Sequence, residues 1–288
     1  MLSEPVLASA EVREIIRRAL AEDGVFNDIT TAALVPSDQA GEGVLLAKED
    51  GVIAGLPVAA SVLVEVDPGS VLVPRVEEGA RIHAGQELAR VRGRYASLLR
   101  GERVALNLLQ RLSGVATMAA RAVEAIAGLP VRVVDTRKTT PGLRPLEKYA
   151  VRVGGAHNHR YNLADGVLIK DNHLAALQAQ GKGIADAVAL TRAAVPHTIR
   201  IEIEVTDLAQ LDEALAAGAE IILLDNMRPE EMSEAVRRCR GRALTEASGG
   251  ITLANIREVA ETGVDIISLG ALTHSAKALD ISMELTAR

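Results

Sequence analysis

The segment Gly166-Val-Leu-Ile-Lys-Asp-Asn-His173 carries the pattern that decides the fold, a short apolar run that ends in a charge. Upstream of it, Val131-Arg-Val-Val-Asp-Thr-Arg-Lys138 has the same form. A charged side chain directly after a buried strand is costly unless a partner or a ligand requires it there. We therefore expect the segment from Asp135 to Asn172 to frame a functional site, against the alternative of a solvated basic face.

Around this segment, the chain alternates apolar strands with helical patterns. Such alternation indicates a parallel sheet that is covered by helices on its faces. The predicted strands are 131–135, 166–170, 199–205, 221–225, 243–248 and 265–270, and the predicted helices are 145–152, 184–194, 208–217, 229–240 and 253–261. We predict an incomplete α/β barrel, because the region is shorter than the ~250 residues usual for eight βα units.

In the first part of the chain, the apolar residues do not follow the regular alternation of strand and helix. A helix is predicted from Ala10 to Glu22, with Ser9 as its cap and Gly24 after its end, and a loop is predicted at 28–31. Short β-type runs follow at 44–48, 51–55, 71–75 and 87–92, with one helix at 57–65. Because regular helices do not separate these strands, we expect an antiparallel sheet.

A long helical pattern joins the two parts. It runs from Tyr95 to Ala127, and the pair Ser113-Gly114 predicts a break into two helices. We accordingly predict an N-terminal α+β sandwich domain at 1–112, which includes the first long helix, and an α/β barrel domain at 113–288. The C-terminal segment of the second domain can return to the first.

Composition excludes several classes of protein. The chain has 288 residues with a net charge of −6, and only 1% of them are aromatic. The acidic balance and the missing aromatic platforms argue against nucleic-acid binding. No apolar run approaches the ~20 residues of a membrane span. One cysteine, Cys239, and an N-terminus, Met1-Leu-Ser-Glu-Pro, without the features of a secretory signal favour a cytoplasmic protein.

Polar residues fall at the carboxyl ends of the predicted strands, where α/β enzymes place their chemistry. They are Asp135, Lys170, Glu204, Asp225, Ser248 and Gly270. Glu204 and Asp225 end neighbouring strands, and such carboxylates can hold Mg²⁺. The alternative for Asp225 is an N-cap of the helix that opens at Pro229. Ser248-Gly249-Gly250 and Gly270 form small turns through which backbone N–H groups can approach a phosphate.

The segment from Asp135 to Asn172 is rich in cations although the whole chain is acidic. These cations are Arg137, Lys138, Arg144, Lys148, Arg152, Arg160 and Lys170. A dense set of this kind is suited to a small polyanion. We therefore expect a phosphosugar with further phosphates and a second ligand that bears carboxylates. The pair His157 and His159 suggests no third metal ligand by its spacing.

A series of long, ordered motifs resembles the quinolinate phosphoribosyltransferase family, also called nicotinate-nucleotide pyrophosphorylase (carboxylating). The motifs are Asp135-Thr-Arg-Lys-Thr-Thr-Pro-Gly-Leu-Arg, His157-Asn-His-Arg, Leu168-Ile-Lys-Asp-Asn-His, Ile203-Glu-Val, Leu224-Asp-Asn, Ala247-Ser-Gly-Gly-Ile and Leu269-Gly-Ala-Leu-Thr-His-Ser. Glu102-Arg103 extends the resemblance into the N-terminal part. Thr140 stands where the family often has an apolar residue.

The resemblance implies a reaction and a fold. Quinolinate and phosphoribosyl pyrophosphate would give nicotinate mononucleotide, pyrophosphate and CO₂, with Mg²⁺, in de novo NAD synthesis in the cytoplasm. The implied fold is an N-terminal α/β sandwich followed by an incomplete, seven-stranded TIM-like α/β barrel. The implied assembly is a homodimer, or dimers packed into a hexamer, in which Arg103 of one subunit completes the site of the other.

The resemblance also assigns the site residues. Lys138, Lys170, Glu204 and Asp225 would be catalytic, with Glu204 and Asp225 holding Mg²⁺. The implied substrate-binding residues are Arg103, Thr136, Arg137, Lys138, His159, Arg160, Lys170, Glu204, Asp225, Ser248, Gly249, Gly250, Gly270 and His274. Cations are needed because quinolinate carries two adjacent carboxylates, and arginine can pair with them in a bidentate manner.

Three alternatives remain open from the sequence. A nicotinate phosphoribosyltransferase or the related molybdenum-transport protein would share the fold and lack some of the cations that bind quinolinate. A Schiff-base aldolase would use Lys170 at its strand end. A non-enzymatic phosphate-binding protein would bind phosphoribosyl pyrophosphate without turnover.

Overall fold

The computed structural model describes Leu7 and residues 9–288, so the expectation for Met1-Leu-Ser-Glu-Pro lies outside the described residues. The chain forms two compact units. The N-terminal unit consists of the chain up to Ala120 with Lys138–Gly155 and Leu272–Arg288, and the barrel unit consists of Arg121–Arg137 with Ala156–Ala271. In the described part of the chain, no helix combines the length and the apolarity that crossing a bilayer requires.

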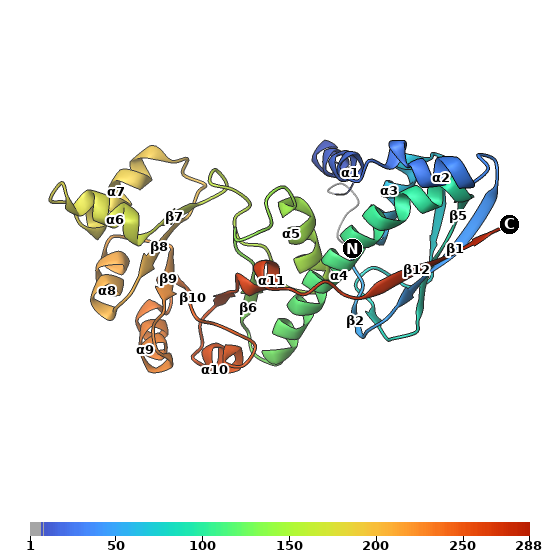
Figure 1. The fold of residues 1–288 in the computed structure, drawn as a ribbon. Coiled ribbons are helices and arrows are strands. Elements are labelled where there is room, and N and C mark those ends of the chain that lie inside the picture. Colours follow the sequence, from blue (N-terminus) through green and yellow to red (C-terminus); the bar gives the residue numbers. More distant parts are fainter. Residues whose placement is uncertain (1–6, 8) are drawn as a thin grey trace. The chain divides into compact units, whose positions relative to one another are not determined.

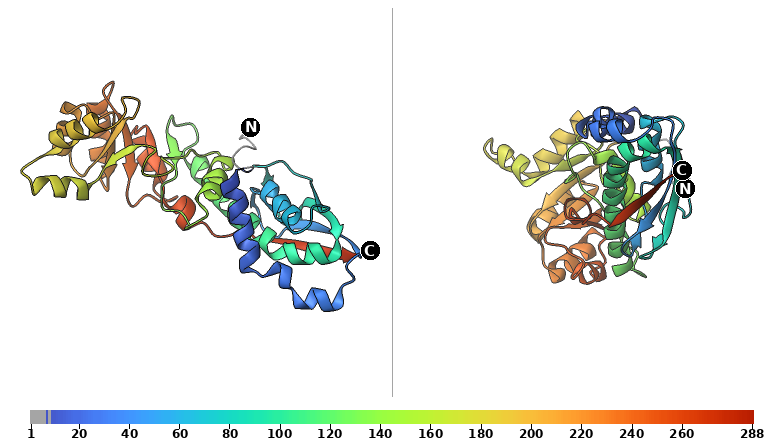
Figure 2. Two further views of the ribbon diagram at one scale, coloured as in Figure 1. Left: turned by 90° about the horizontal axis from the view of Figure 1, so that it is seen from above. Right: turned by 45° about the vertical axis from the view of Figure 1, so that its right-hand side comes forward.

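The N-terminal unit is built on a four-stranded sheet in the order β12-β1-β5-β3. Its strands are β1 (Ala40–Ala47), β3 (Val71–Pro74), β5 (Glu87–Arg94) and β12 (Ile281–Ala287). All three pairings are antiparallel, which confirms the expectation from the sequence. β12, the last strand of the chain, lies beside β1 (Figures 1 and 2). A further short pair, β2 (Gly51–Val52) with β4 (Arg81–Ile82), is also antiparallel.

Three short helices accompany this sheet. α1 (Ala10–Glu22) begins as predicted, with Ser9 accepting the N–H of Val12, and α3 spans Leu56–Val66. The predicted loop at 28–31 is wrong, because a single 3₁₀ turn, η1 (Val25–Asn27), is followed there by helix α2 (Ile29–Leu34). Asp28 starts α2 by accepting the N–H groups of Thr30 and Thr31, which is an N-cap signal that the sequence contained.

One continuous helix, α4 (Tyr95–Ala125), replaces the two that were predicted. Ser113 and Gly114 lie inside it without breaking it. The Ser113 hydroxyl is buried and bonds both backbone groups of Ala54, at 3.1 and 3.2 Å. A side chain on Gly114 would overlap the carbonyl oxygen of Lys277. The two residues therefore mark a place where other backbone segments approach the helix closely, rather than its end.

The barrel unit is a six-stranded parallel sheet in the order β6-β11-β10-β9-β8-β7 (Figure 1). Parallel strands that alternate with helices confirm the predicted α/β class. The strands are β6 (Arg132–Val134), β7 (Val167–Ile169), β8 (Ile201–Val205), β9 (Ile221–Asp225), β10 (Leu244–Ser248) and β11 (Ile266–Ser268). The helices of this unit are α6 (Asp171–Gln178), α7 (Ile184–Ala194), α8 (Leu208–Ala216), α9 (Pro229–Cys239) and α10 (Ile256–Glu261). Helix α5 (Arg144–Val153) belongs to the N-terminal unit, as does α11 (Ala271–His274) from Leu272 onward.

The strand order closes on itself except at one place. β11, the last strand of this unit, pairs with β6, the first, and a single parallel bridge joins Val134 of β6 to His157. The ring of paired segments thus opens between His157 and β7, and six strands with one bridged residue occupy the place of the seven strands that the resemblance implied. This is the incomplete barrel expected from the sequence.

Register brings the polar positions onto one face of this sheet. Side chains alternate between the two faces along a strand, and directly paired residues share a face. Glu204 pairs with Leu223, Leu223 with Glu246, and Ser248 with Asp225. Because Glu202 and Glu204 are two residues apart, all four acidic side chains of β8, β9 and β10 project from the same face.

We predict that Gly114→Ala destabilises the N-terminal unit although alanine is the better helix former. The new methyl group would meet the backbone of Lys277, and such overpacking costs about 1–3 kcal/mol. Gly101→Ala in the same helix is the matched control, because the nearest atom there is the end of the Leu63 side chain, at 2.9 Å, which can move. In urea unfolding, the free energy of unfolding of Gly114→Ala should be clearly lower than that of Gly101→Ala. Equal values would show that the Lys277 backbone does not restrict position 114.

Candidate active site

Lys170 and Glu204 meet at the carboxyl ends of β7 and β8. The register pairs Ile169 with Ile203, so the next residue on each strand lies side by side with its neighbour. Lys170 Nζ lies 2.7 Å from Glu204 Oε2, and the lysine side chain keeps 47% of its surface exposed while that of Glu204 keeps 10%. The charge that follows the apolar run thus has a partner and also reaches solvent, where a ligand can compete for it.

Asp225 lies on the next strand end and does not cap the following helix. The N-cap of α9 is Arg228, whose N–H donates to Glu231. Asp225 instead accepts a hydrogen bond of 2.8 Å from the side chain of Asn226, which has a left-handed backbone with φ 54°. Two carboxylates, Glu204 and Asp225, therefore project from one face of adjacent strands and supply the hard oxygen donors that Mg²⁺ prefers.

The turn after β10 is shaped around Asn226. The N–H of Asn226 donates to the carbonyl of Ser248, and a side chain on Gly249 would overlap the Asn226 amide. Gly249 and Gly250 both have positive φ, 86° and 61°. From the sequence, we predicted that these glycines let backbone N–H groups approach a phosphate. In the structure, the missing side chain at Gly249 also leaves space for the Asn226 amide beside Asp225.

Asp135 organises the segment that carries His159 and Arg160. Its carboxylate is fully buried and accepts hydrogen bonds from the Asn158 side chain, at 2.7 Å, and from the N–H of His159, at 2.8 Å. The bridge between Val134 and His157 lies next to it. A strand-end aspartate thus holds the following loop against β6.

Two guanidinium groups, Arg137 and Arg160, lie close enough to influence each other. Burial and the like charge of Arg137 lower the pKa of Arg160, and Glu202 partly offsets this. Arg160 Nη1 donates to the carbonyl of Gly166 at 2.8 Å. Both arginines are half-buried, so their charges are screened less than those of surface groups and can attract an anion strongly.

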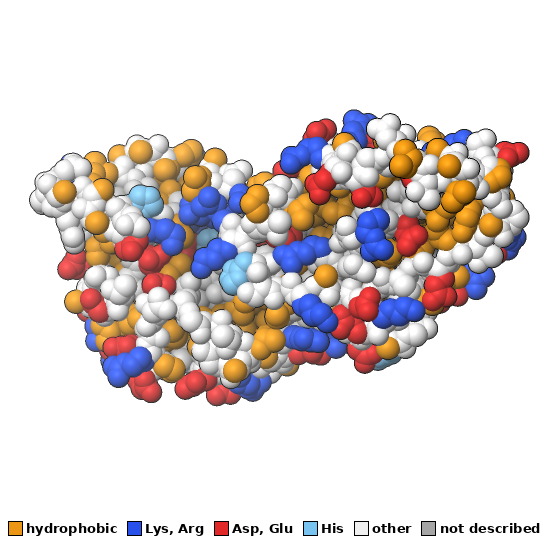
Figure 3. Space-filling view, in the orientation of Figure 1, with side chains coloured by type: hydrophobic (Ala, Val, Ile, Leu, Met, Phe, Trp, Pro, Cys, Tyr) orange, Lys and Arg blue, Asp and Glu red, His pale blue; other side chains and the backbone are white. Residues whose placement is uncertain are grey.

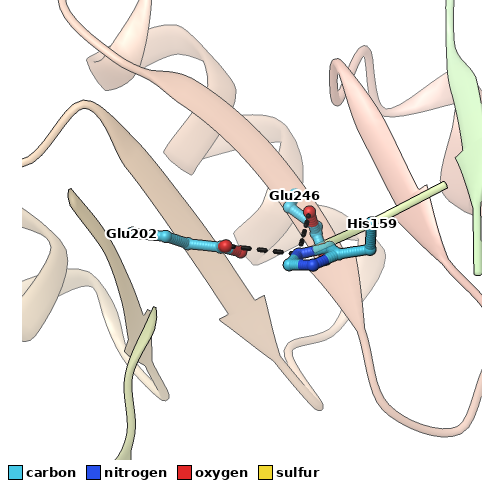
Figure 4. A group of neighbouring side chains, drawn as sticks. All are labelled: His159, Glu202 and Glu246. Atoms are coloured by element: carbon cyan, nitrogen blue, oxygen red, sulfur yellow. Dashed lines mark ion pairs between the residues drawn. The ribbon is translucent and has the colours of Figure 1, made fainter. Parts of the chain in front are cut away.

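His159 lies between Glu202 of β8 and Glu246 of β10 (Figure 4). Its Nε2 is 3.2 Å from Glu202 Oε2 and 3.5 Å from Glu246 Oε2, and both glutamates are buried. Burial lowers the pKa of His159, but hydrogen bonds to the two carboxylates outweigh it and raise this pKa to about 10. Burial also raises the pKa of Glu202. The cluster therefore favours an additional proton.

The position of that proton follows from the other ring nitrogen. The N–H of Arg160 donates to His159 Nδ1 at 2.8 Å, and a ring protonated at both nitrogens would have no acceptor there. The raised pKa of His159 and the hydrogen bond at Nδ1 point to different positions for this proton. We give the hydrogen bond more weight, because it is direct geometry, and assign the Nε2–H tautomer with the additional proton on Glu202, whose pKa burial raises. Both ring nitrogens of His159 are thus engaged within the protein.

Glu202 and Glu246 were missed in the sequence, although a signal for each was present. Both lie two residues before a predicted site residue on the same strand, Glu202 before Glu204 and Glu246 before Ser248. A period of two places each pair on one face of the sheet. Acidic residues inside apolar strands such as Ile201-Glu-Ile-Glu-Val are themselves a sign of a polar interior.

The N-terminal unit carries three more of the predicted residues, Arg103, Lys138 and His274. The carbonyl of Lys138 accepts a hydrogen bond of 2.8 Å from Thr273, and buried Glu147 holds the next turn through the N–H of Thr140, at 3.0 Å. Glu147 in turn forms an ion pair of 2.6 Å with Arg111. These contacts fix the backbone of the loop that carries Lys138, while its side chain is exposed.

Arg103 and His274 are exposed. His274 Nδ1 lies 2.7 Å from the Ser275 hydroxyl. Burial raises the pKa of Glu102, and the charge of the neighbouring Arg103 partly offsets this. In the barrel unit, Thr136 follows β6 and Gly270 follows β11, at the same carboxyl edge as the other predicted residues.

Comparisons with known proteins agree over nearly the whole chain. The model of the quinolinate phosphoribosyl transferase N-terminal domain matches residues 28–113, and that of the C-terminal domain matches residues 115–284. The chain is 47% identical over 279 residues to nicotinate-nucleotide pyrophosphorylase [carboxylating] of Mycobacterium leprae, covering 95% of this chain and 96% of that protein. It is 42% identical over 276 residues to the probable enzyme of the same name from Bacillus subtilis, covering 96% and 94%.

Among solved structures, NadC from Streptococcus pyogenes superposes with a TM-score of 0.91 at 43% identity. The superposition covers 96% of each chain. The architecture described above is therefore shared with that protein.

We predict that Gly249→Ala is far more damaging than Gly250→Ala. Both positions require a left-handed backbone, which costs an alanine about 1–2 kcal/mol. Only Gly249→Ala adds an overlap with Asn226, since at Gly250 the nearest atom of that side chain is 3.9 Å away. Thermal unfolding of the two variants should therefore differ, with Gly249→Ala lower, and a reversed order would show that Asn226 does not shape this turn.

Proposed function

The chain belongs to the quinolinate phosphoribosyltransferase family, and from that premise we propose how its residues carry out the family's reaction. The protein is a nicotinate-nucleotide pyrophosphorylase (carboxylating), a pentosyltransferase that produces nicotinate mononucleotide from quinolinate in NAD biosynthesis. The observation that carries this conclusion is the match of both family domains along the chain, at more than 40% identity to the bacterial relatives.

We propose that the cations at the strand ends bind the two carboxylates of quinolinate. Arg137 and Arg160 supply planar, permanently charged donors, and Lys170 supplies a point charge that is now held by Glu204. Assembly of like charges in a half-buried place is unfavourable until an anion neutralises them. Substrate binding therefore relieves the repulsion that lowers the pKa of Arg160. Lys138, which follows Arg137 in the chain, belongs to the same set.

Glu204 and Asp225 are the proposed ligands of Mg²⁺, directly or through water. Both are carboxylates from one face of neighbouring strands, which fits a hard cation. When bound together with phosphoribosyl pyrophosphate, the ion would stabilise negative charge on the departing pyrophosphate. In this proposal Lys170 changes partner on substrate binding. It pairs with Glu204 in the free protein and with a quinolinate carboxylate in the complex. This exchange keeps the site close to neutral at each stage.

The turn Ser248-Gly249-Gly250 and Gly270 form the proposed 5′-phosphate corner. Small residues there allow backbone N–H groups to reach phosphate oxygens. Thr136 and His274 are proposed as further substrate contacts, and His159 contributes through the backbone of Arg160, since its ring nitrogens are engaged. Asp225 borders this corner through its pairing with Ser248.

The chemistry requires charge stabilisation rather than a protein nucleophile. The pyridine nitrogen of quinolinate attacks the anomeric carbon of the sugar as the bond to pyrophosphate breaks, through a cationic, oxocarbenium-like transition state. The carboxyl group beside the nitrogen then departs as CO₂ and leaves its electron pair on the ring carbon, where the adjacent pyridinium nitrogen stabilises it. A proton from solvent at that carbon completes nicotinate mononucleotide. Preorganised charges in Arg137, Arg160 and Lys170 hold the ring in place for both steps.

We propose a homodimer, alone or packed into a hexamer, in which Arg103 of each subunit completes the site of the other. Arg103 is exposed on α4, which leaves its guanidinium accessible to a second subunit, and this supports the proposal. Hydrophobic side chains gather over the part of the N-terminal unit that holds α2 (Figure 3). Phe26, Ile29 and Leu34 are 63%, 83% and 76% exposed, and such a patch favours a subunit contact.

Two further proposals concern organisation and location. The division into domains at 1–112 and 113–288 is supported by the family models, one of which ends at 113 and the other of which begins at 115. Helix α4 runs across that division without interruption. A cytoplasmic location is supported by the single cysteine, Cys239, which is buried and unpaired.

The first test supplies the purified protein with Mg²⁺ and phosphoribosyl pyrophosphate, and with either quinolinate or nicotinate. We expect nicotinate mononucleotide and an equal amount of CO₂ from quinolinate, and no product from nicotinate, because the latter lacks the second carboxylate that the cations bind. Chromatography and release of labelled CO₂ measure the two products. Product from nicotinate at a comparable rate would place the activity with the nicotinate phosphoribosyltransferases.

A complementation test addresses the shared site. Arg103→Ala and Lys170→Ala should each be nearly inactive, and their co-expressed mixture should recover about a quarter of wild-type activity, since half of the dimers are mixed and each of these has one intact site. Lys138→Ala mixed with Lys170→Ala is the control, because both residues are proposed to serve one site from the same subunit. Recovery in the control, or none in the first mixture, would contradict the assignment of Arg103.

A further inference from the structure

The buried cluster of His159, Glu202 and Glu246 lies beside the proposed quinolinate site, and of its three members only His159 was among the predicted site residues (Figure 4). Its parts come from three separate segments, since Glu202 is on β8, Glu246 is on β10 and His159 follows the bridge to β6. The outer oxygens Glu202 Oε1 and Glu246 Oε1 are buried without a hydrogen-bond partner. Two buried carboxylates around one imidazole are costly for stability, so the arrangement calls for a function.

The spacing of the three groups resembles a metal site, but the hydrogen bonding excludes one. All three ligand atoms lie within 4.8 Å of one another. A histidine that binds a metal through Nε2 carries its proton on Nδ1 and donates it to a neighbouring acceptor. Here Nδ1 accepts the N–H of Arg160, so Nε2 carries the proton and points it at the carboxylates. The cluster is therefore a chain of hydrogen bonds that ends on the backbone of Arg160.

Two hydrogen bonds hold Arg160, one through its backbone and one through its side chain. Its backbone N–H is tied to His159 Nδ1, and its guanidinium is tied to the carbonyl of Gly166. The first of these hydrogen bonds depends on the ring orientation of His159, which Glu202 and Glu246 fix by converging on its Nε2 from β8 and β10 (Figure 4). Release of the ring would free the peptide between His159 and Arg160 to rotate, and the direction of the Arg160 side chain would then change.

We propose that Glu202 and Glu246 are positioning residues that act through His159 to aim Arg160 at quinolinate. This inference rests on the proposed role of Arg160 as a ligand of the substrate. It assigns the two glutamates a part in recognition of the dicarboxylate and none in binding phosphoribosyl pyrophosphate. A rigid support for a binding side chain preserves affinity because the side chain does not have to be ordered when the substrate arrives.

Glu246 is the residue to change, because Glu202 is two residues from a proposed Mg²⁺ ligand. Glu246→Leu removes the acceptor and should raise the KM for quinolinate about tenfold, the size expected when a buried donor loses its partner. The KM for phosphoribosyl pyrophosphate should stay unchanged. Glu246→Gln keeps an acceptor and removes the charge, so its KM for quinolinate should stay near or below the wild-type value, since less negative charge then opposes the substrate.

Two controls separate positioning from general damage. Asp265→Asn perturbs another hydrogen-bonded carboxylate of the same sheet, which accepts from Thr245 at the opposite edge, and should leave both KM values unchanged. Arg160→Lys should raise the KM for quinolinate alone. In the Arg160→Lys background, Glu246→Leu should add little, because both changes remove the same interaction.

The outcomes are distinct. An unchanged KM for quinolinate in folded Glu246→Leu, a parallel rise in both KM values, or full additivity with Arg160→Lys would overturn the inference. A normal KM in Arg160→Lys would overturn the substrate site itself and the inference with it. If Glu246→Leu fails to fold, His159→Asn and His159→Gln decide, since only asparagine places an acceptor near the Nδ1 position. Asparagine should then retain more quinolinate affinity than glutamine, and equal loss would overturn the proposal.

Discussion

The mutual repulsion of cations at the carboxyl ends of the strands is the constraint on which the barrel unit depends. Arg137 and Arg160 are close enough to disturb each other, and Lys170 follows a buried strand. Two of these cations are offset by a carboxylate from the sheet, since Glu204 pairs with Lys170 and Glu202 attracts Arg160. These carboxylates project from the face of the sheet on which the cations lie. The sheet therefore supplies the opposite charge. These carboxylates offset the repulsion only in part, so an anion bound at the proposed site would relieve the remainder and would compete with Glu204 for Lys170.

The N-terminal unit meets a different constraint, which is the close approach of backbone segments to α4. Ser113 bonds both backbone groups of Ala54, and Thr117, one turn later, bonds the N–H of Val52. Gly114 lies against Lys277 on the segment that leads into β12. Small polar residues and a glycine on one long helix thus anchor β2 and the C-terminal segment, which are far apart in the sequence.

Much of the architecture could be predicted, because the spacing of apolar residues identifies strands and helices that bury one face. Ile184–Ala194 and Ile221–Asp225 were predicted with the bounds that the structure has. Helix α6, Asp171–Gln178, was missed because it buries none of its residues and so leaves no amphipathic pattern. The break at Ser113-Gly114 was wrong because local sequence does not show which distant backbone will press on a helix.

The candidate site was predictable to the extent that it depends on single strand ends. Lys170, Glu204 and Asp225 lie at the edge that the sequence indicated, and their roles stay predictions. The cluster of His159, Glu202 and Glu246 could not be predicted from the sequence, because it depends on the tertiary structure. A histidine from a loop contacts side chains of β8 and β10, and β9 lies between these two strands. Only the period of two along β8 and β10 hinted at it.

The opening in the ring of strands has a consequence for energetics. Within residues 9–288, no strand pairing joins the His157 bridge to β7, and the guanidinium of Arg160 bonds the carbonyl of Gly166 at this opening. If Arg160 binds the dicarboxylate as proposed, the same side chain holds this wall of the barrel and contacts the substrate. The free energy of binding would then be reduced by any loss of the hydrogen bond to Gly166, and the rigidity of the wall would contribute to substrate affinity.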